Sequence, residues 1–249
     1  MRFANLQIVK RTIRLAALVL FAATTLTGCQ VIDGTLLYTQ VRIIDASPDA
    51  PGLDVYQNST ASLYNIGFGT ASSYIAITPG TYTYSVDTTG TKQQLASVTG
   101  AFAVGAQYTV LIGNVTANLQ MTMLKDQSTA APAGQVALRF LDQSTRNGPV
   151  DIYLLPANGK LTGLTPVVTD IRFGNTPIYL DVPIGTYSIL VVPTGTAPSG
   201  TTSPLYTGSQ VEYSSGAART VVLIDQQLVT TPGLQVITAD DYDAPGAAT

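Results

Sequence analysis

The residues best placed to do chemistry lie in one stretch, RIIDASPDAPGLDVY, residues 42–56. It holds Asp45, Ser47, Asp49 and Asp54 between two apolar runs. Oxygen-bearing side chains at alternate positions, as in the first three of these, are typical of the start of a calcium-binding loop. Alternatively, Asp and Ser side chains cap backbone N–H groups in a turn whose dihedral angles are set by Pro and Gly.

The sequence favours the turn. A calcium loop of the EF-hand type needs Gly at its sixth position and Glu at its twelfth, where this stretch has Ala50 and Tyr56. A second stretch, RFLDQSTRNGPVDIY at residues 139–153, aligns with the first without a gap and places Arg146 opposite Asp49. Because a guanidinium would repel a cation, we expect no metal here. Calcium bound by Asp45, Ser47 and Asp49 remains the weaker alternative.

The two stretches begin an internal duplication. Four turn residues recur in both copies: Arg42/Arg139, Asp45/Asp142, Ser47/Ser144 and Asp54/Asp151. Three later blocks match in the same order after an insertion of eight residues in the second copy: Phe68-Gly69 with Phe173-Gly174, Gly80-Thr81-Tyr82 with Gly185-Thr186-Tyr187, and GAQYTVLI with GAARTVVL. A unit of roughly a hundred residues is longer than a solenoid repeat, so each copy should have its own core. The shared turn residues predict an Arg–Asp contact across a fixed turn.

Within each copy the apolar residues recur with a period of two, which indicates β-strands. The segment TYTYSV (residues 81–86) alternates polar and apolar side chains, whereas its counterpart TYSILVV (186–192) is more apolar and should be more central. Turn residues punctuate the chain every eight to twelve positions, as in antiparallel sandwiches. The fold class predicted is all-β, with two tandem antiparallel β-sandwich domains.

The first 29 residues differ from the rest. Arg2, Lys10, Arg11 and Arg14 precede the apolar run LAALVLFAATTL, which has the length of a signal-peptide core and is too short for a confident membrane span. The run ends in LTGC, where Cys29 is the only cysteine of the protein. This resembles a bacterial lipobox, which implies cleavage before Cys29 and attachment of acyl chains, palmitate among them, to that residue. Gln30 in the next position implies the outer membrane.

These features divide the chain into six parts. They are a lipoprotein signal peptide (1–28), the lipidated cysteine with a short tether (29–38), a first sandwich (39–125), a linker (126–135), a second sandwich (136–239) and an acidic disordered tail (240–249).

The motifs V-R-I-I-D-A-S-P-D-A-P-G-L-D-V-Y, F-G-x(4)-Y and P-G-T-Y in the first copy resemble the DUF4397 family of bacterial envelope proteins. The resemblance covers most of residues 40–240, although the second copy lacks A-S-P-D-A-P and has Ile184 in place of Pro79. It implies an immunoglobulin- or transthyretin-like sandwich on a secreted or surface protein. The family has no known function, so the resemblance implies no activity.

Composition narrows the function. After removal of the signal peptide, 8 Lys and Arg face 15 acidic residues, so the net charge is −7 and nucleic acid is not expected as a partner. The chain has no His, which excludes Ser-His-Asp and Cys-His catalysis and His-ligated zinc. We therefore expect no enzyme and no cofactor; a hydrolase that uses a carboxylate pair, Asp45 with Asp54 or Asp142 with Asp151, is the distant alternative.

Two non-catalytic functions remain open. The first is an interaction or scaffold module that is anchored to the membrane through Cys29 and binds another envelope protein. The second is a carbohydrate-binding module that uses exposed tyrosines, for which Tyr74, Tyr82, Tyr84 and Tyr108 are the candidates. Tyrosines that recur in both copies, among them Tyr74 and Tyr82, are better explained by packing or by tyrosine corners.

Overall fold

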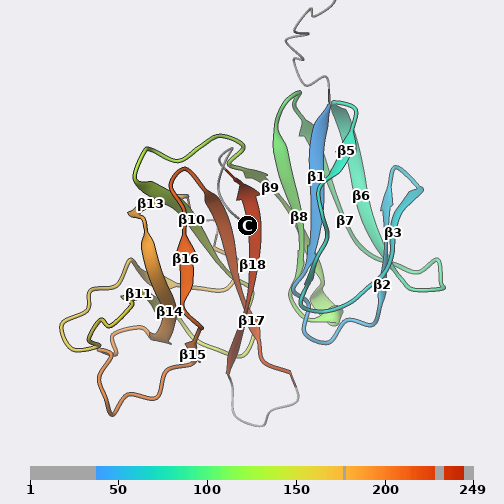
Figure 1. Ribbon diagram of the computed structural model, residues 1–249. Coiled ribbons are helices and arrows are strands. Elements are labelled where there is room, and N and C mark those ends of the chain that lie inside the picture. The colour runs from blue at the N-terminus through green and yellow to red at the C-terminus, as the bar shows by residue number, and fades with distance from the viewer. Residues whose placement is uncertain (1–37, 176–177, 228–232, 244–249) are drawn as a thin grey trace, which may run out of the picture. The chain divides into compact units, whose positions relative to one another are not determined.

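The strands follow the two-residue period that the sequence predicts. The computed structural model in Figure 1 describes residues 38–175, 178–227 and 233–243. In β1 (Thr39–Asp45), Val41 and Ile43 point into one apolar cluster and Ile44 points into another, as alternate side chains of a strand must. The predicted signal peptide, Cys29 and most of the tether lie outside the described residues.

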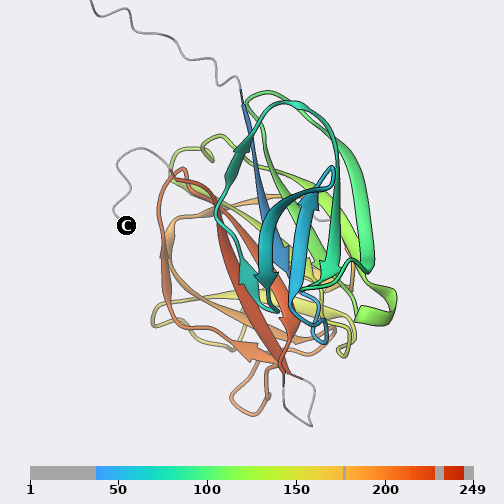
Figure 2. The ribbon, with the colours of Figure 1, turned by 90° about the vertical axis from the view of Figure 1, so that its right-hand side faces the viewer.

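The first half of the described chain forms two sheets, which enclose one core (Figure 2). We call the sheet ordered β4-β1-β8-β9, with β5 also paired to β1, its inner sheet, and the sheet ordered β3-β2-β6-β7 its outer sheet. The inner sheet contains β1, β4 (Thr70–Ala71), β5 (Ile75–Ile77), β8 (Gln107–Gly113) and β9 (Gln120–Asp126). The outer sheet contains β2 (Leu53–Gln57), β3 (Thr60–Ile66), β6 (Gly80–Thr88) and β7 (Gln94–Phe102). A 3-10 turn, η1 (Thr116–Asn118), joins β8 to β9.

The second half repeats this arrangement. Its inner sheet is ordered β13-β10-β17-β18, and its outer sheet is ordered β12-β11-β14-β15 with β16 also paired to β14. The inner sheet contains β10 (Gln135–Asp142), β13 (Leu180–Pro183), β17 (Ala218–Asp225) and β18 (Leu234–Tyr242). The outer sheet contains β11 (Val150–Pro156), β12 (Val168–Ile171), β14 (Gly185–Pro193), β15 (Tyr206–Thr207) and β16 (Val211–Tyr213). A separate cluster of buried side chains fills this second sandwich.

The all-β class is confirmed, and most strand pairs are antiparallel. One pair in each half is parallel: β1 with β8, and β10 with β17. Strand direction was not visible in the sequence because a period of two is the same whichever way a neighbouring strand runs. The parallel pair forms because the chain crosses to the outer sheet and back between the two strands.

The more apolar counterpart segment is also more buried, as predicted. Residues 188–192 of β14 are buried throughout, whereas β6 alternates between buried and partly buried positions. The reason is that a loop packs on the outer face of the outer sheet in the second half. Leu161 and Leu164, from the long β11–β12 connection, pack on Tyr153, Leu190 and Val192.

The two inner sheets pack against each other. A third apolar cluster joins residues of both halves: Ile44, Ala46, Leu111 and Leu124 from the first, and Leu141, Val222, Ile224, Ile237 and Ala239 from the second. Both faces of each inner sheet are therefore buried, which explains the nearly unbroken apolar runs in β8, β10 and β17.

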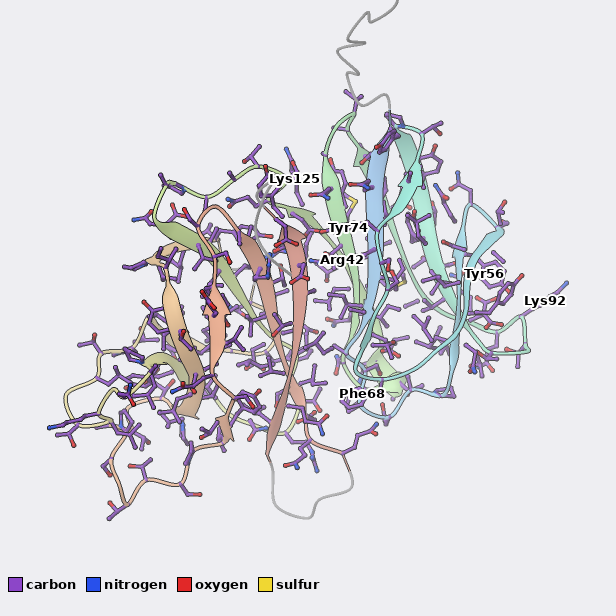
Figure 3. All side chains as sticks on the ribbon, in the orientation of Figure 1. Arg42, Tyr56, Phe68, Tyr74, Lys92 and Lys125 are labelled. Carbon is purple, nitrogen blue, oxygen red and sulfur yellow. The ribbon has the colours of Figure 1, made fainter. Side chains whose placement is uncertain are left out.

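Arg42 of β1 crosses this interface. Its guanidinium donates to Thr109 Oγ1 at 2.8 Å within its own half, and to the carbonyl of Asp240 at 2.9 Å and the carboxylate of Asp241 in the other half. The guanidinium lies 4.9 Å from the centre of the Tyr74 ring, and the two side chains can be seen together in Figure 3. Arg42 is only 2% exposed, so its charge depends on these partners.

Arg139 of β10 makes the same contacts in reverse. It donates to Thr220 Oγ1 at 3.1 Å, to the Lys125 carbonyl at 3.0 Å and to Asp126 Oδ1 at 2.5 Å, and its guanidinium lies 4.7 Å from the ring centre of Tyr179. The carboxylates of Asp126 and Asp241 accept further hydrogen bonds from equivalent side chains. Thr109 and Tyr74 both donate to Asp126 Oδ2, and Thr220 and Tyr179 both donate to Asp241 Oδ2. We call these eight side chains the reciprocal network.

Burial and the neighbouring charges shift the pKa of Arg42 and of Asp241 in the reciprocal network. Burial alone would lower the pKa of Arg42, but Asp241 and Asp126 outweigh it and the pKa lies above its ordinary value. Burial raises the pKa of Asp241, with Arg42 opposing that shift. The network pairs two arginines with two aspartates across the interface.

Two sequence-based expectations are corrected here. The Arg–Asp contact expected across the turn is wrong, because Arg42 and Asp45 are three positions apart and so point to opposite faces of β1. The start expected for the disordered tail, residue 240, is also wrong. Strand β18 continues through Tyr242, and Asp241 is only 3% exposed. This end of β18 contains acidic residues because one of them, Asp241, pairs with Arg42.

Replacing Arg42 by Ala should lower the free energy of unfolding by about 3–5 kcal/mol, because Asp241 would remain buried without its cation. Urea denaturation at neutral pH measures this change. The matched control is Arg172→Ala, which breaks an ion pair to Asp170 whose side chains are 66% and 50% exposed, and should cost less than about 1 kcal/mol. Equal losses in the two variants would contradict a structural role for the reciprocal network.

Candidate functional site

The turn residues singled out in the sequence do not converge on one point. Asp45 ends β1 and Ser47 follows two residues later, and both are 0% exposed. Asp49 is exposed and turns to another loop, where its Oδ1 accepts hydrogen bonds from the N–H of Thr116 at 2.7 Å and from its hydroxyl at 3.0 Å. The A-S-P-D-A-P loop therefore combines a buried half with an exposed half.

Asp45 and Asp142 are buried carboxyls in equivalent places. Asp45 Oδ1 accepts the Ser47 N–H at 2.9 Å, and Asp142 Oδ1 accepts the Ser144 N–H at 2.8 Å. Within the described residues, Oδ2 of each carboxyl has no hydrogen-bond partner. Burial raises the pKa of both Asp45 and Asp142 to about 6, and nearby Asp225 adds to the shift at Asp142.

Asp54 and Asp151 anchor turns, as the structural reading predicted. Asp54 accepts hydrogen bonds from the N–H of Asn65 at 2.9 Å, the Thr89 hydroxyl at 2.9 Å and the N–H of Gly90 at 3.2 Å. These hydrogen bonds, that from Asn65 most of all, hold the pKa of Asp54 below its ordinary value.

The equivalent Asp151 accepts from the N–H of Asp170, the Thr194 hydroxyl and the N–H of Gly195, all at 2.9–3.0 Å. Burial acts against ionisation of Asp151, but these bonds outweigh it and its pKa is lowered. Each of the two aspartates thus ties the start of an outer-sheet strand to two loops, and its carboxylate is already engaged.

The second copy contains an acceptor that sequence reasoning missed. Asp225, at the end of β17 and 1% exposed, accepts hydrogen bonds from Ser144 Oγ at 2.9 Å, from the N–H and hydroxyl of Thr145, and from the N–H of Arg146 at 3.2 Å. Asn114 occupies the equivalent position of the first copy in the sequence alignment. The Asn-to-Asp difference at these aligned positions was the signal in the sequence.

The exposed halves of the two turns meet at one cleft. It has a volume of about 410 Å³, which lies within the range of about 300–1,000 Å³ that is typical of ligand sites. The lining residues come from both copies: Pro48, Asp49, Val115, Thr145, Arg146, Asp225, Gln226 and Gln227. We call this the loop cleft.

Polar contacts across the loop cleft hold its walls together. Gln227 Nε2 donates to the Pro48 carbonyl at 2.6 Å, which links the second copy to the first. Arg146 donates to the Gln226 carbonyl, and its Nε lies 3.6 Å from Asp225 Oδ1. The cleft therefore presents a carboxylate, a guanidinium and amides beside the apolar surface of Pro48 and Val115.

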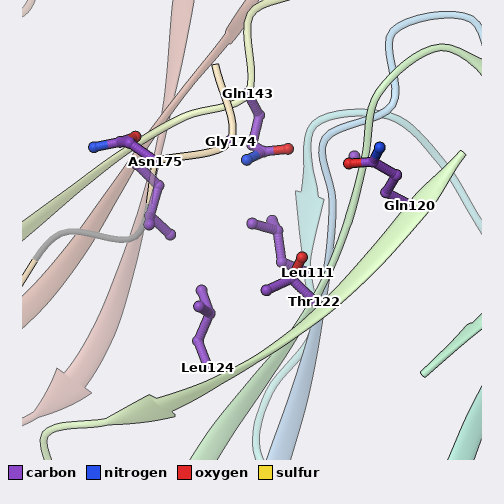
Figure 4. Close-up of a pocket in the computed structure, with 9 residues that line it drawn as sticks. Leu111, Gln120, Thr122, Leu124, Gln143, Gly174 and Asn175 are labelled. Atoms are coloured by element: carbon purple, nitrogen blue, oxygen red, sulfur yellow. The ribbon is translucent and has the colours of Figure 1, made fainter. Parts of the chain in front are cut away.

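A smaller cavity lies between the inner sheets. Its volume is about 50 Å³, enough for little more than water, and its lining residues include Leu111, Gln143 and Asn175 (Figure 4). The Gln143 side chain fits there because it packs against Gly113, which has no side chain. A Cβ added at Gly113 would lie 2.0 Å from Gln143 Oε1. The cavity is a packing detail of the interface.

Of the four tyrosines proposed as a sugar-binding surface, two are buried and two are partly buried. Tyr84 and Tyr108 are 2% and 6% exposed and belong to the first core, so their assignment as exposed residues is wrong. Tyr74 lies against Arg42. Tyr82 and Tyr187 form matching tyrosine corners, in which each hydroxyl bonds to the carbonyl four residues before it, at 3.0 and 3.1 Å.

The geometry gives little support to metal binding. Within the ranges that the structure describes, no three His, Cys, Asp or Glu side chains form a group that could hold a metal ion. The proposed calcium ligands are engaged separately, since Asp45 accepts from Ser47 and Asp49 accepts from Thr116. In the same described residues, no helix is long and apolar enough to span a bilayer.

Comparison with known proteins adds one family. Residues 39–153 match the model of DUF4397, described as a domain of unknown function. The match contains the whole first sandwich, β10 and the first part of β11, and it supports the family resemblance over that range. The second sandwich beyond this point is assigned from its own strand order.

Other comparisons are less informative. No curated protein matches the chain. Among solved structures, the chain is similar to one described as "Alpha-glucan binding by a streptococcal virulence factor", with 11% sequence identity, coverage of 72% of this chain and 92% of that chain, and a TM-score of 0.23. A likeness at this TM-score carries no argument about the function of this protein.

The buried carboxyls predict an unusual pH dependence. Because the pKa of Asp45 and Asp142 is about 6 in the folded state and 3.8 ordinarily, the folded protein binds more protons between these values. The free energy of unfolding should therefore rise as pH falls from 7 towards 4, by on the order of 2 kcal/mol per carboxyl. Asp54 and Asp151 act oppositely, but only below pH 3.8, because their pKa is lowered.

Urea unfolding between pH 4.5 and 8 tests this dependence. The Asp45→Asn/Asp142→Asn variant keeps both Oδ1 acceptors and should be more stable than wild type at pH 7.5, with a flatter profile. A slope of the same sign should remain from Asp241, whose pKa burial also raises. Parallel profiles for the variant and the wild type would show that these two carboxyls do not titrate in this range.

Proposed function

We propose that this protein is a non-catalytic lipoprotein of the cell envelope, anchored in the outer membrane through acyl chains on Cys29, and that it serves as an interaction or scaffold module. Its partner in this proposal is another envelope protein, which binds at the loop cleft. The anchor is inferred from the basic start, the apolar run and LTGC at the N-terminus. Three acyl chains would hold the protein stably, since a single chain binds a bilayer only marginally.

One observation carries the interaction proposal: the exposed loops of both copies line a single cleft, while every carboxylate that recurs in both copies is committed to the fold. Asp45 and Asp142 are buried, and Asp54 and Asp151 hold turns. Asp49 and Arg146, which differ in charge between the copies, line the cleft and stay partly exposed while they bond to Thr116 and Gln226. Opposite charges on two walls of one cleft fit a partner surface of mixed polarity.

Carbohydrate binding is the alternative. Of the tyrosines first assigned to it, Tyr84 and Tyr108 are buried and Tyr74 and Tyr82 make structural contacts. In this alternative the sugar binds the carboxylate, guanidinium and amide groups of the loop cleft. No separate observation favours this alternative over a protein partner.

In-cell cross-linking of the full-length protein, followed by purification and identification of the attached species, tests the proposal. We expect one discrete protein partner that is lost in Cys29→Ala, which has no thiol to acylate. Val115→Arg, which places a long cation in the loop cleft, should also lose the partner. The matched control is Val211→Arg on β16, where Val211 is 47% exposed and lies outside the cleft.

Recovery of no protein in wild type would contradict the interaction proposal. Retention on immobilised glycans that Val115→Arg abolishes and Val211→Arg preserves would then favour carbohydrate binding. Capture of the same partner by wild type and Val115→Arg would place the interaction elsewhere on the molecule.

A further inference from the structure

The end of the first sandwich where the described chain begins has an unusual surface. Tyr38 is 40% exposed and Val104, in the β7–β8 loop, is 53% exposed. The two lie side by side, because the N–H of Gly105 donates to the Tyr38 carbonyl at 3.0 Å. The turn of residues 78–80 lies at the same end, since Ile77 pairs with Thr39. We call Tyr38, residues 78–80 and residues 103–105 the proximal tip.

The proximal tip carries no charge. Its residues are Tyr38, Thr78, Pro79, Gly80, Ala103, Val104 and Gly105. On the neighbouring strands β8 and β9, the exposed charged side chain nearest to the proximal tip is that of Lys125. It pairs with Tyr108 of β8 and is labelled at this end of the molecule in Figure 3. The carboxylate that follows it, Asp126, is buried beneath Arg139.

The equivalent end of the second sandwich is different. Arg219 stands where the first copy has Tyr108, and its guanidinium pairs with Asp240 and Asp243. Ser215 stands where the first copy has Val104, by the alignment of Gly216 with Gly105. An uncharged, partly apolar end is therefore a property of the copy that follows the N-terminal segment, and not of the fold itself.

This composition suits the headgroup region of a bilayer. Tyrosine favours that region because one end of its ring is apolar and the other is polar, and a lysine at its edge reaches lipid phosphates. Eight residues lie between Cys29 and Tyr38, so the nine steps of chain that join them span at most about 30 Å. We propose that the proximal tip rests on the bilayer surface, with Val104 and Tyr38 in the headgroup region. This inference depends on the acylated anchor proposed above.

The consequence is a fixed orientation. Pro48 and Asp49 follow the other end of β1, and Val115 follows the equivalent end of the parallel strand β8. Seven residues of strand place the loop cleft about 20 Å from the proximal tip. If the proximal tip rests on the membrane in which the protein is anchored, the loop cleft faces away from that membrane. Partners would then approach the cleft from the side opposite the bilayer.

Tryptophan fluorescence tests the contact, because the chain has no Trp. Val104→Trp, and Ala103→Trp as a second probe in the same loop, are prepared as full-length acylated protein in phosphatidylethanolamine–phosphatidylglycerol vesicles with brominated acyl chains. Each should show a blue-shifted emission that the bromine quenches. The matched control is Tyr64→Trp on β3, where Tyr64 is 69% exposed and lies outside the proximal tip; its emission should stay unshifted and unquenched.

Two further measurements separate this inference from the anchor. Mass spectrometry of the N-terminal peptide reports acylation, and co-flotation with vesicles reports membrane attachment. Flotation of acylated protein with both tip probes unquenched would overturn the tip contact and leave the anchor intact. Absence of acylation and flotation would overturn the anchor and the tip contact together.

Discussion

The structure depends on burying two arginines and two aspartates where two sheets meet. Such a burial is costly for any one of these groups alone, and it is tolerated only because each arginine finds its carboxylate in the other copy. The apolar cluster around Ile44, Leu141 and Val222 could join the sheets in many registers, whereas directional hydrogen bonds to Arg42 and Arg139 select one. The reciprocal network therefore specifies how the copies meet and, through that, which loops line the cleft.

The residues that recur in both copies have one of two structural roles. Arg42, Thr109 and Tyr74, with their counterparts, form the interface, while Asp54 and Asp151 hold the turns of the outer sheets. Two of the differences between the halves lie at the ends of the molecule: Asp49 and Arg146 at the loop cleft, and Tyr108 and Arg219 near the proximal end. A partner or a membrane would be met at these ends.

The sequence predicted the strand pattern well, because the two-residue period and the turn residues are local signals. It also identified Asp54 and Asp151 as turn residues, since both copies keep them. It failed at Tyr84 and Tyr108, because a side chain in a β-strand alternates between core and solvent and the composition of the strand does not say which face is covered. It also failed at Arg42, whose partner Asp241 is 199 residues away and leaves no local pattern. The loop cleft was not predictable, because its walls come from turns in different copies.

The parallel pairing of β1 with β8 and of β10 with β17 has a kinetic consequence. The first strand of each copy waits for a strand 67–81 residues later, as the contacts of Arg42 with Thr109 and of Arg139 with Thr220 record. The contact between Arg42 and Asp241 forms later still, once nearly the whole chain has been supplied. Chains dominated by such distant contacts fold slowly, because the entropy of closing long loops is lost before the contacts are gained. A partly synthesised chain therefore holds an unmatched arginine and an open inner sheet until its last strand arrives.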